Sequence, residues 1–140
     1  MESLWCEGLR KKYPQLLGGI SMMECAQGWE KLLDEMCSTI VKYESFAANE
    51  TGYTPLRFVQ IKEKFGSLRA YTEGGFFSDE SRSQQKQQNI ERAIHRTVDY
   101  FEGLSVYVCS CCGAVSEPSL KRGLLTNYCD ECRRKWQSMT

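Results

Sequence analysis

Five of the eight cysteines lie in the last third of the chain, and their spacing is typical of a metal site. Cys109 and Cys112 form a Cys-x-x-Cys-Gly pair, and Cys129 and Cys132 form a second Cys-x-x-Cys pair. Two intervening residues let both thiolates of a pair turn onto one ion at about 2.3 Å, and the glycine after the first pair relieves the tight turn. The spacing predicts a zinc site made by Cys109, Cys112, Cys129 and Cys132.

Such a site is expected to be structural. Four thiolates fill a tetrahedral shell, whereas catalytic zinc keeps an open position and usually has a His or carboxylate ligand. No His-x-Glu precedes the cysteines, so the zinc-deaminase pattern is absent. The fifth thiol, Cys111, is expected to point away from the ion. A zinc ribbon and a treble clef both use paired Cys-x-x-Cys knuckles, so either is compatible with the sequence.

No other group of residues in the sequence has the spacing of a catalytic or ligand-binding site. His95 is the only histidine, and no Ser or Cys motif accompanies it, so nucleophilic catalysis lacks partners. No glycine-rich phosphate loop occurs. Cys6, Cys25 and Cys37 are expected to pack in the core as small apolar groups. We therefore expect a protein that is not an enzyme and has no small-molecule substrate.

The composition is that of an ordinary globular chain. Of the 140 residues, 41% are hydrophobic, and 18 Lys and Arg balance 18 Asp and Glu. Without net charge, no global field attracts nucleic acid or a membrane, so such binding needs a local patch. No signal peptide or membrane span is expected, which predicts a cytoplasmic location where thiols stay reduced and bind metals.

Helical spacing of apolar residues predicts two long helices. The first spans about 24–46 and carries Trp29, Leu32, Leu33, Met36, Cys37 and Ile40. The second spans about 79–102 and carries Ile90, Ala93, Ile94, Thr97, Val98 and Phe101. Between them, residues 57–72 alternate apolar and polar, which predicts a β-hairpin with a loop of four or five residues. The expected fold is an α+β core over 1–105 followed by a four-cysteine zinc knuckle over 106–140.

Two groups of cations are candidate partner-binding sites. The hairpin carries Arg57, Lys62, Lys64 and Arg69, interleaved with Phe58, Phe65 and Tyr71. Basic and aromatic residues on paired strands suit stacking on single-stranded nucleic acid. Alternatively, strand alternation places the aromatic rings in the core and the cations in water. The second group, Arg133, Arg134 and Lys135, follows the last cysteine on a terminal helix.

The motifs together resemble a group of short bacteriophage-encoded proteins of unassigned function. The matching stretches are KKYPQLL (11–17), SM (21–22), GWEKLLDEMC (28–37), VQIKEKFGSLRAY (59–71) and the closing Cys-x-x-Cys-Gly with Cys-x-x-Cys. This resemblance covers most of the chain, and KEKFGSLR is its most specific part. It implies a phage or prophage origin and a bacterial cytoplasm, and it implies no activity.

Two functions are open at this stage. The first is a non-enzymatic, zinc-binding interaction protein that binds and inhibits or modulates a bacterial protein or ribonucleoprotein. Phage accessory proteins of this size often inhibit host defence, and anti-CRISPR proteins are examples, so an anti-defence role is one expectation by association. The alternative is a nucleic-acid-binding regulatory protein that uses the zinc knuckle and the basic hairpin. Its affinity would fall steeply with salt.

Overall fold

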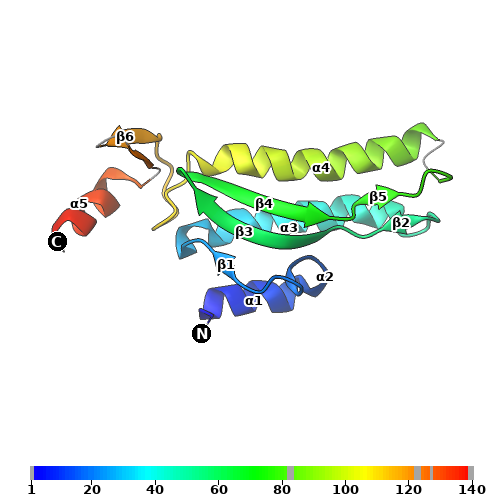
Figure 1. Cartoon of the computed structure of the whole chain (residues 1–140), viewed down its shortest axis with the longest axis horizontal. Coiled ribbons are helices and arrows are strands. Elements are labelled where there is room, and N and C mark those ends of the chain that lie inside the picture. Colours follow the sequence, from blue (N-terminus) through cyan, green and yellow to red (C-terminus); the bar gives the residue numbers. More distant parts are fainter. Residues whose placement is uncertain (1, 82–83, 122–123, 127, 139–140) are drawn as a thin grey trace.

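The computed structural model describes residues 2–81, 84–121, 124–126 and 128–138, and it has a mixed α+β architecture, as predicted (Figure 1). Its elements, in chain order, are α1 (Leu4–Lys12), α2 (Pro14–Leu17), β1 (Met23–Glu24), η1 (Gln27–Trp29), α3 (Glu30–Glu44), η2 (Ser45–Ala47), β2 (Tyr53–Thr54), β3 (Arg57–Lys64), β4 (Ser67–Glu73), β5 (Phe76–Phe77), α4 (Gln85–Ser105), β6 (Ser119–Lys121), β7 (Leu124–Thr126) and α5 (Asp130–Ser138). Within the described residues, none of the helices combines the length and the apolar character that a bilayer-spanning helix requires.

The main sheet has three strands in the order β1-β3-β4. β3 and β4 form the predicted antiparallel hairpin, and β1 adds a short parallel pair on the other side of β3. The buried residues Phe58, Ile61, Leu68 and Ala70 face the helices, since they belong to one core cluster with residues of α3 and α4. Figure 1 shows α4 running along β4 and α3 behind β3, so the helices cover one face of the sheet.

The hairpin turn is shorter than predicted. Only Phe65 and Gly66 separate the strands, and both have positive φ, 53° and 79°. Two such residues form a type I′ turn, whose twist matches that of the flanking strands. The expectation of a four- or five-residue loop is therefore wrong.

Helix α3 begins later than the predicted position near 24. Met23 and Glu24 are extended because they pair with Ile61 and Lys62 of β3. A 3₁₀ turn follows, and its Trp29 is completely buried. The helix then buries Leu32, Leu33, Met36, Cys37 and Ile40, the residues that the sequence pattern places on its apolar face.

Helix α4 is shifted toward the C-terminus relative to the predicted 79–102. Residues 82 and 83 of that prediction lie outside the described residues. Before them, Ser78 donates its amide to the carbonyl of Gly52, and Ser81 closes a turn on Ser78, so the chain is not helical there. At the other end, α4 continues to Ser105, which is fully buried.

Side chains of α4 pair with the outer edge of β4. The amide of Leu68 donates to Ser105 Oγ at 2.8 Å, and the amide of Ala70 donates to Glu102 Oε2 at 2.9 Å. These acceptors take the place of a further strand. They fix α4 to the sheet and leave this edge less available for pairing with another chain.

Candidate metal centre

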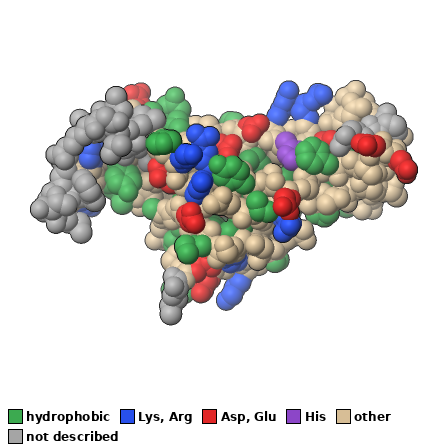
Figure 2. Space-filling view, in the orientation of Figure 1, with side chains coloured by type: hydrophobic (Ala, Val, Ile, Leu, Met, Phe, Trp, Pro, Cys, Tyr) green, Lys and Arg blue, Asp and Glu red, His purple; other side chains and the backbone are tan. Residues whose placement is uncertain are grey.

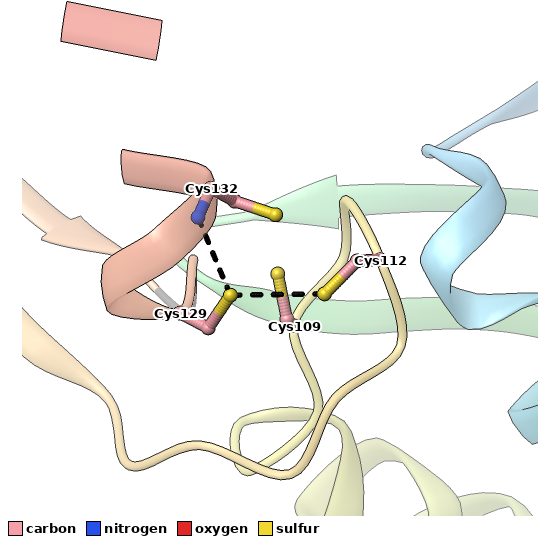
Figure 3. A group of neighbouring side chains, drawn as sticks. All are labelled: Cys109, Cys112, Cys129 and Cys132. Atoms are coloured by element: carbon pink, nitrogen blue, oxygen red, sulfur yellow. Dashed lines mark hydrogen bonds between the residues drawn. The ribbon is translucent and has the colours of Figure 1, made fainter. Parts of the chain in front are cut away.

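The structure brings the four predicted cysteines together. The sulfur atoms of Cys109, Cys112, Cys129 and Cys132 all lie within 4.8 Å of one another, and this group could hold a metal ion. Cys112 Sγ and Cys129 Sγ are 3.7 Å apart. Figure 3 shows the sulfur atoms gathered between a loop and the first turn of α5.

The first pair sits on a knuckle in the loop after α4. The amide of Gly113 donates to the carbonyl of Cys109, and the amide of Cys109 donates to the carbonyl of Ala114, both at 2.8 Å. These bonds fold the chain back so that Cys109 and Cys112 share one side. Gly113 has φ of +84°, a conformation that glycine adopts without the cost a side chain adds.

The second pair begins a helix. Cys129 precedes α5, and Cys132 lies in its first turn, where its amide donates to Cys129 Sγ at 3.4 Å. The positive end of a helix dipole and free amides favour a thiolate at this position. The β6–β7 hairpin connects the two cysteine pairs, and it was not predicted from the sequence.

The thiols influence one another's protonation. Burial opposes ionisation of Cys109, but the backbone amides of Cys129, Cys112 and Cys111 outweigh it and lower its pKa to about 7. Burial, followed by the neighbouring thiols, raises the pKa of Cys132. Thiolates this close repel one another, and a cation bound between them would offset that repulsion.

The knuckle is bound directly to η1, the turn that precedes α3. The amide of Gly28 donates to the carbonyl of Ser110, and the indole Nε1 of Trp29 donates to the carbonyl of Val108, both at 2.9 Å. A Cβ at Gly28 would lie 2.4 Å from the carbonyl oxygen of Cys109. The sequence did not predict this contact, although Gly28 and Trp29 open the stretch GWEKLLDEMC (28–37) that resembles phage-encoded proteins.

The remaining cysteines are not members of this group, although Cys111 lies beside it and contributes to the raised pKa of Cys132. Cys111 is exposed and is not one of the four clustered thiols. Cys6 and Cys37 are buried in the core as predicted, and Cys25 packs against it. Burial raises the pKa of Cys25 and of Cys37 to about 12, so both stay protonated and unreactive at neutral pH.

The hairpin cations all lie at the surface. Arg57, Lys64 and Arg69 are exposed, and Lys62 is half-buried. The aromatic residues divide: Phe58 is fully buried, whereas Phe65 and Tyr71 are 66% and 45% exposed. The alternative that strand alternation places the aromatic rings in the core therefore holds for Phe58 and not for Phe65 and Tyr71.

The cations of α5 are largely paired within their own helix. Arg133 binds Asp130 at 2.6 Å, and Lys135 lies 3.4 Å from Glu131. Arg134 is exposed. Intrahelical pairing of this kind lowers the charge that α5 presents to a partner, so the hairpin is the stronger of the two predicted cationic sites.

The chemistry of the cluster is that of four soft sulfur donors that lie within 4.8 Å of one another. Thiolates select zinc, copper(I) and iron–sulfur clusters over magnesium or calcium. Within the described residues, no other group of His, Cys, Asp and Glu is arranged to hold a metal. No protein-family model, curated protein or solved structure matches the chain.

Proposed function

We propose that Cys109, Cys112, Cys129 and Cys132 bind one Zn²⁺ ion. Four sulfur atoms at about 2.3 Å from zinc in a tetrahedron are about 3.8 Å apart, by geometry. The 3.7 Å separation of Cys112 Sγ and Cys129 Sγ matches this spacing. The low pKa of Cys109 favours the thiolate that the metal needs.

The zinc is structural in this proposal. Four thiolates leave no coordination position for water or substrate, so the ion organises the chain around it. The knuckle, the β6–β7 hairpin and the helix-borne second pair follow one another as in a treble clef. In a zinc ribbon, the second pair would lie on another knuckle. Of the two types compatible with the sequence, the treble clef is therefore favoured.

We infer that the chain is a non-enzymatic interaction protein of a bacterial cytoplasm. The observation that carries this inference is the cluster of four thiols, because a metal held by all four would offer a rigid surface and no reactive site. The resemblance to phage-encoded proteins supplies the partner class: a bacterial protein or ribonucleoprotein that is inhibited or modulated. An anti-defence role, of which anti-CRISPR activity is one form, is the proposed setting.

The metal is tested by native mass spectrometry of protein made without added metal. We expect one zinc per chain. One iron per chain, with the colour of an iron–thiolate centre, would contradict zinc, and a metal-free chain that keeps the same fold would contradict any structural metal.

The partner is tested by affinity capture from a bacterial lysate treated with nuclease. The bait is the full chain, and Cys112→Ser is the matched control that loses the metal shell. We expect one host protein complex to remain on the wild-type bait and to be lost from the variant. Equal recovery on both baits, or no host protein on either bait when nuclease is omitted, would contradict this function.

A further inference from the structure

The open face of the β3–β4 hairpin gathers cations. Lys62 is paired in register with Arg69, and Gln60 with Tyr71, so these side chains share one side of the sheet. Lys64 lies two residues from Lys62 on the same strand and therefore points the same way. We call Lys62, Lys64, Phe65, Arg69 and Tyr71 the hairpin patch.

The opposite side of the same strands is the core. Ile61 and Ala70, which pair with each other, are buried against the helices, and so is Leu68. The hairpin patch therefore lies on the face that no helix of the described chain covers. Figure 2 views the molecule from this side and shows basic and hydrophobic side chains grouped near its middle.

The positive charge of the patch is not neutralised locally. Lys62, Lys64 and Arg69 form no ion pair with any residue in the described part of the chain. Glu63 lies opposite Leu68, on the other side of the strands, and accepts the amide of Gly66.

Two further acids border the patch. Glu73 is bound to Arg57 at the far end of the hairpin. Glu24 of β1 lies beside Lys62. Because Glu73 is already paired with Arg57, Glu24 is, among the described residues, the one bordering acid left to face Lys62, Lys64 and Arg69. In a chain with no net charge, this local excess makes the face suited to a polyanion.

Two aromatic rings are exposed among these cations. Lys62 Nζ lies 5.6 Å from the centre of the Tyr71 ring, and Lys64 Nζ lies 5.6 Å from that of Phe65. Each ring is held beside a cation, and a substantial part of each is in contact with water.

Phe65 is an unusual residue for its position. It occupies the first place of the two-residue turn with φ of +53°, where asparagine, aspartate or glycine is preferred. A residue with a side chain is strained in this backbone conformation. The Phe65 ring is also 66% exposed, so burial contributes little to offset that strain. The fold gives no reason for a phenylalanine at this position, whereas a ligand that stacks on the ring would explain it.

We propose that the hairpin patch binds single-stranded nucleic acid. Bases stack on Tyr71 and Phe65, while phosphates pair with Lys62, Lys64 and Arg69. Exposed aromatic rings interleaved with cations on a sheet surface are the features by which proteins hold single strands. An acidic protein segment would satisfy the cations but would not need the strained, exposed ring of Phe65. This inference is independent of the zinc proposal, since none of its residues is a metal ligand.

The test is fluorescence anisotropy with the zinc-loaded full chain. The probes are labelled oligo-uridylate and oligo-thymidylate of about 20 nucleotides, a length that exceeds the patch. Between about 50 and 200 mM salt, the logarithm of the association constant should fall linearly with that of the salt concentration. The two probes distinguish RNA from DNA, and binding of either supports the proposal.

The cations are tested by the triple variant Lys62→Gln, Lys64→Gln, Arg69→Gln. Each lost phosphate contact lowers the salt slope by about 0.7, so the slope should fall by about 2. The matched control is Lys11→Gln, Lys31→Gln, Lys42→Gln, which removes the same charge from exposed helix positions. It should keep the wild-type slope.

The aromatic residues are tested by Phe65→Asn and Tyr71→Leu. Asparagine suits the turn, so Phe65→Asn should leave the melting temperature unchanged or higher while weakening binding about tenfold. Tyr71→Leu should weaken binding similarly without changing the salt slope. Circular dichroism and zinc content verify that every variant is folded and metal-loaded.

Three results would overturn the proposal. The first is no binding of either probe at about 50 mM salt. The second is an equal loss of binding in the hairpin and control triple variants. The third is full competition by oligo-glutamate, combined with unchanged binding of Phe65→Asn, which would assign the patch to an acidic protein. None of these changes the zinc content, so a failure here is distinguishable from a failure of the metal proposal.

Discussion

The amide of Gly28 donates a 2.9 Å hydrogen bond to the carbonyl of Ser110, which joins η1, the turn before α3, to the loop carrying the first cysteine pair. The approach is close in both directions, because a Cβ at Gly113 would lie 3.0 Å from the carbonyl oxygen of Gly28. Two glycines thus allow backbone to pack on backbone. This contact couples the candidate metal centre to the core.

Replacing Gly28 with alanine should force these segments apart. The added Cβ would meet backbone atoms of Cys109 and Ser110 at 2.4–2.5 Å, and backbone cannot move aside as a flexible side chain can. We expect a loss of about 1–3 kcal/mol in the free energy of unfolding, measured by urea denaturation.

Gly103→Ala is the matched control for this substitution. It lies in α4 with no atom within 4 Å of the added Cβ, so it should stabilise the chain by about 0.5–1 kcal/mol. Equal effects of the two substitutions would contradict a tight contact at Gly28.

Metal removal should release the knuckle from η1. Without a cation, the clustered thiolates repel or become protonated, and the loop loses the ion that folds it. We expect chelation to increase hydrogen exchange at the amides of Cys109, Gly113 and Arg133, and also at Gly28, which is distant in sequence. The amides of α3 around Met36 are the internal control and should stay protected. Unchanged protection at Gly28 would show that the contact does not depend on metal.

Ser105 is predicted to matter through the edge of β4. It accepts the amide of Leu68 at 2.8 Å and donates to the carbonyl of Glu102 at 2.6 Å. Ser105→Ala leaves a buried amide without its acceptor, which should lower the free energy of unfolding by about 1–3 kcal/mol. Ser45→Ala removes the same kind of bond, to Lys42, at an exposed position and should cost less than about 0.5 kcal/mol. Similar losses would contradict a role for the sheet edge.

Asp34 should give stability a pH dependence. Hydrogen bonds from Tyr13, at 2.5 Å, and then from Lys12 lower the pKa of its carboxyl group. A lowered pKa means that this stabilisation is present above the ordinary value of about 3.9 and is lost as pH falls through the folded-state value.

The corresponding measurement compares wild type with Asp34→Asn in urea. The difference between their unfolding midpoints should be largest near pH 6 and shrink toward pH 3. The exposed neighbour Glu35, changed to Gln, is the control and should show a smaller difference. A difference for Asp34→Asn that grows as the pH falls would reverse the assigned sign.

Local spacing in the sequence predicts much of this molecule. The Cys-x-x-Cys pairs identify the four clustered thiols because two intervening residues fix their geometry within one turn. Helical periodicity identifies the buried face of α3, from Leu32 to Ile40, because burial on one face follows the 3.6-residue repeat.

The features that were missed depend on contacts distant in sequence. Met23 and Glu24 are extended only because β3 lies beside them, and two residues are too few to show a period. Strands β2 and β5 are equally short. The contact between Gly28 and Ser110 spans most of the chain, and nothing near either residue indicates it.

The most direct test of the metal centre is the zinc content of Cys111→Ser and Cys112→Ser, measured by native mass spectrometry beside the wild type. Both substitutions replace one exposed thiol of the same loop, so they differ in position and not in chemistry. The structure places Cys112 in the cluster and Cys111 outside it. We predict one zinc per chain in the wild type and in Cys111→Ser, and loss of zinc in Cys112→Ser. Equal zinc loss in both variants, or retention in Cys112→Ser, would contradict the proposed ligand set.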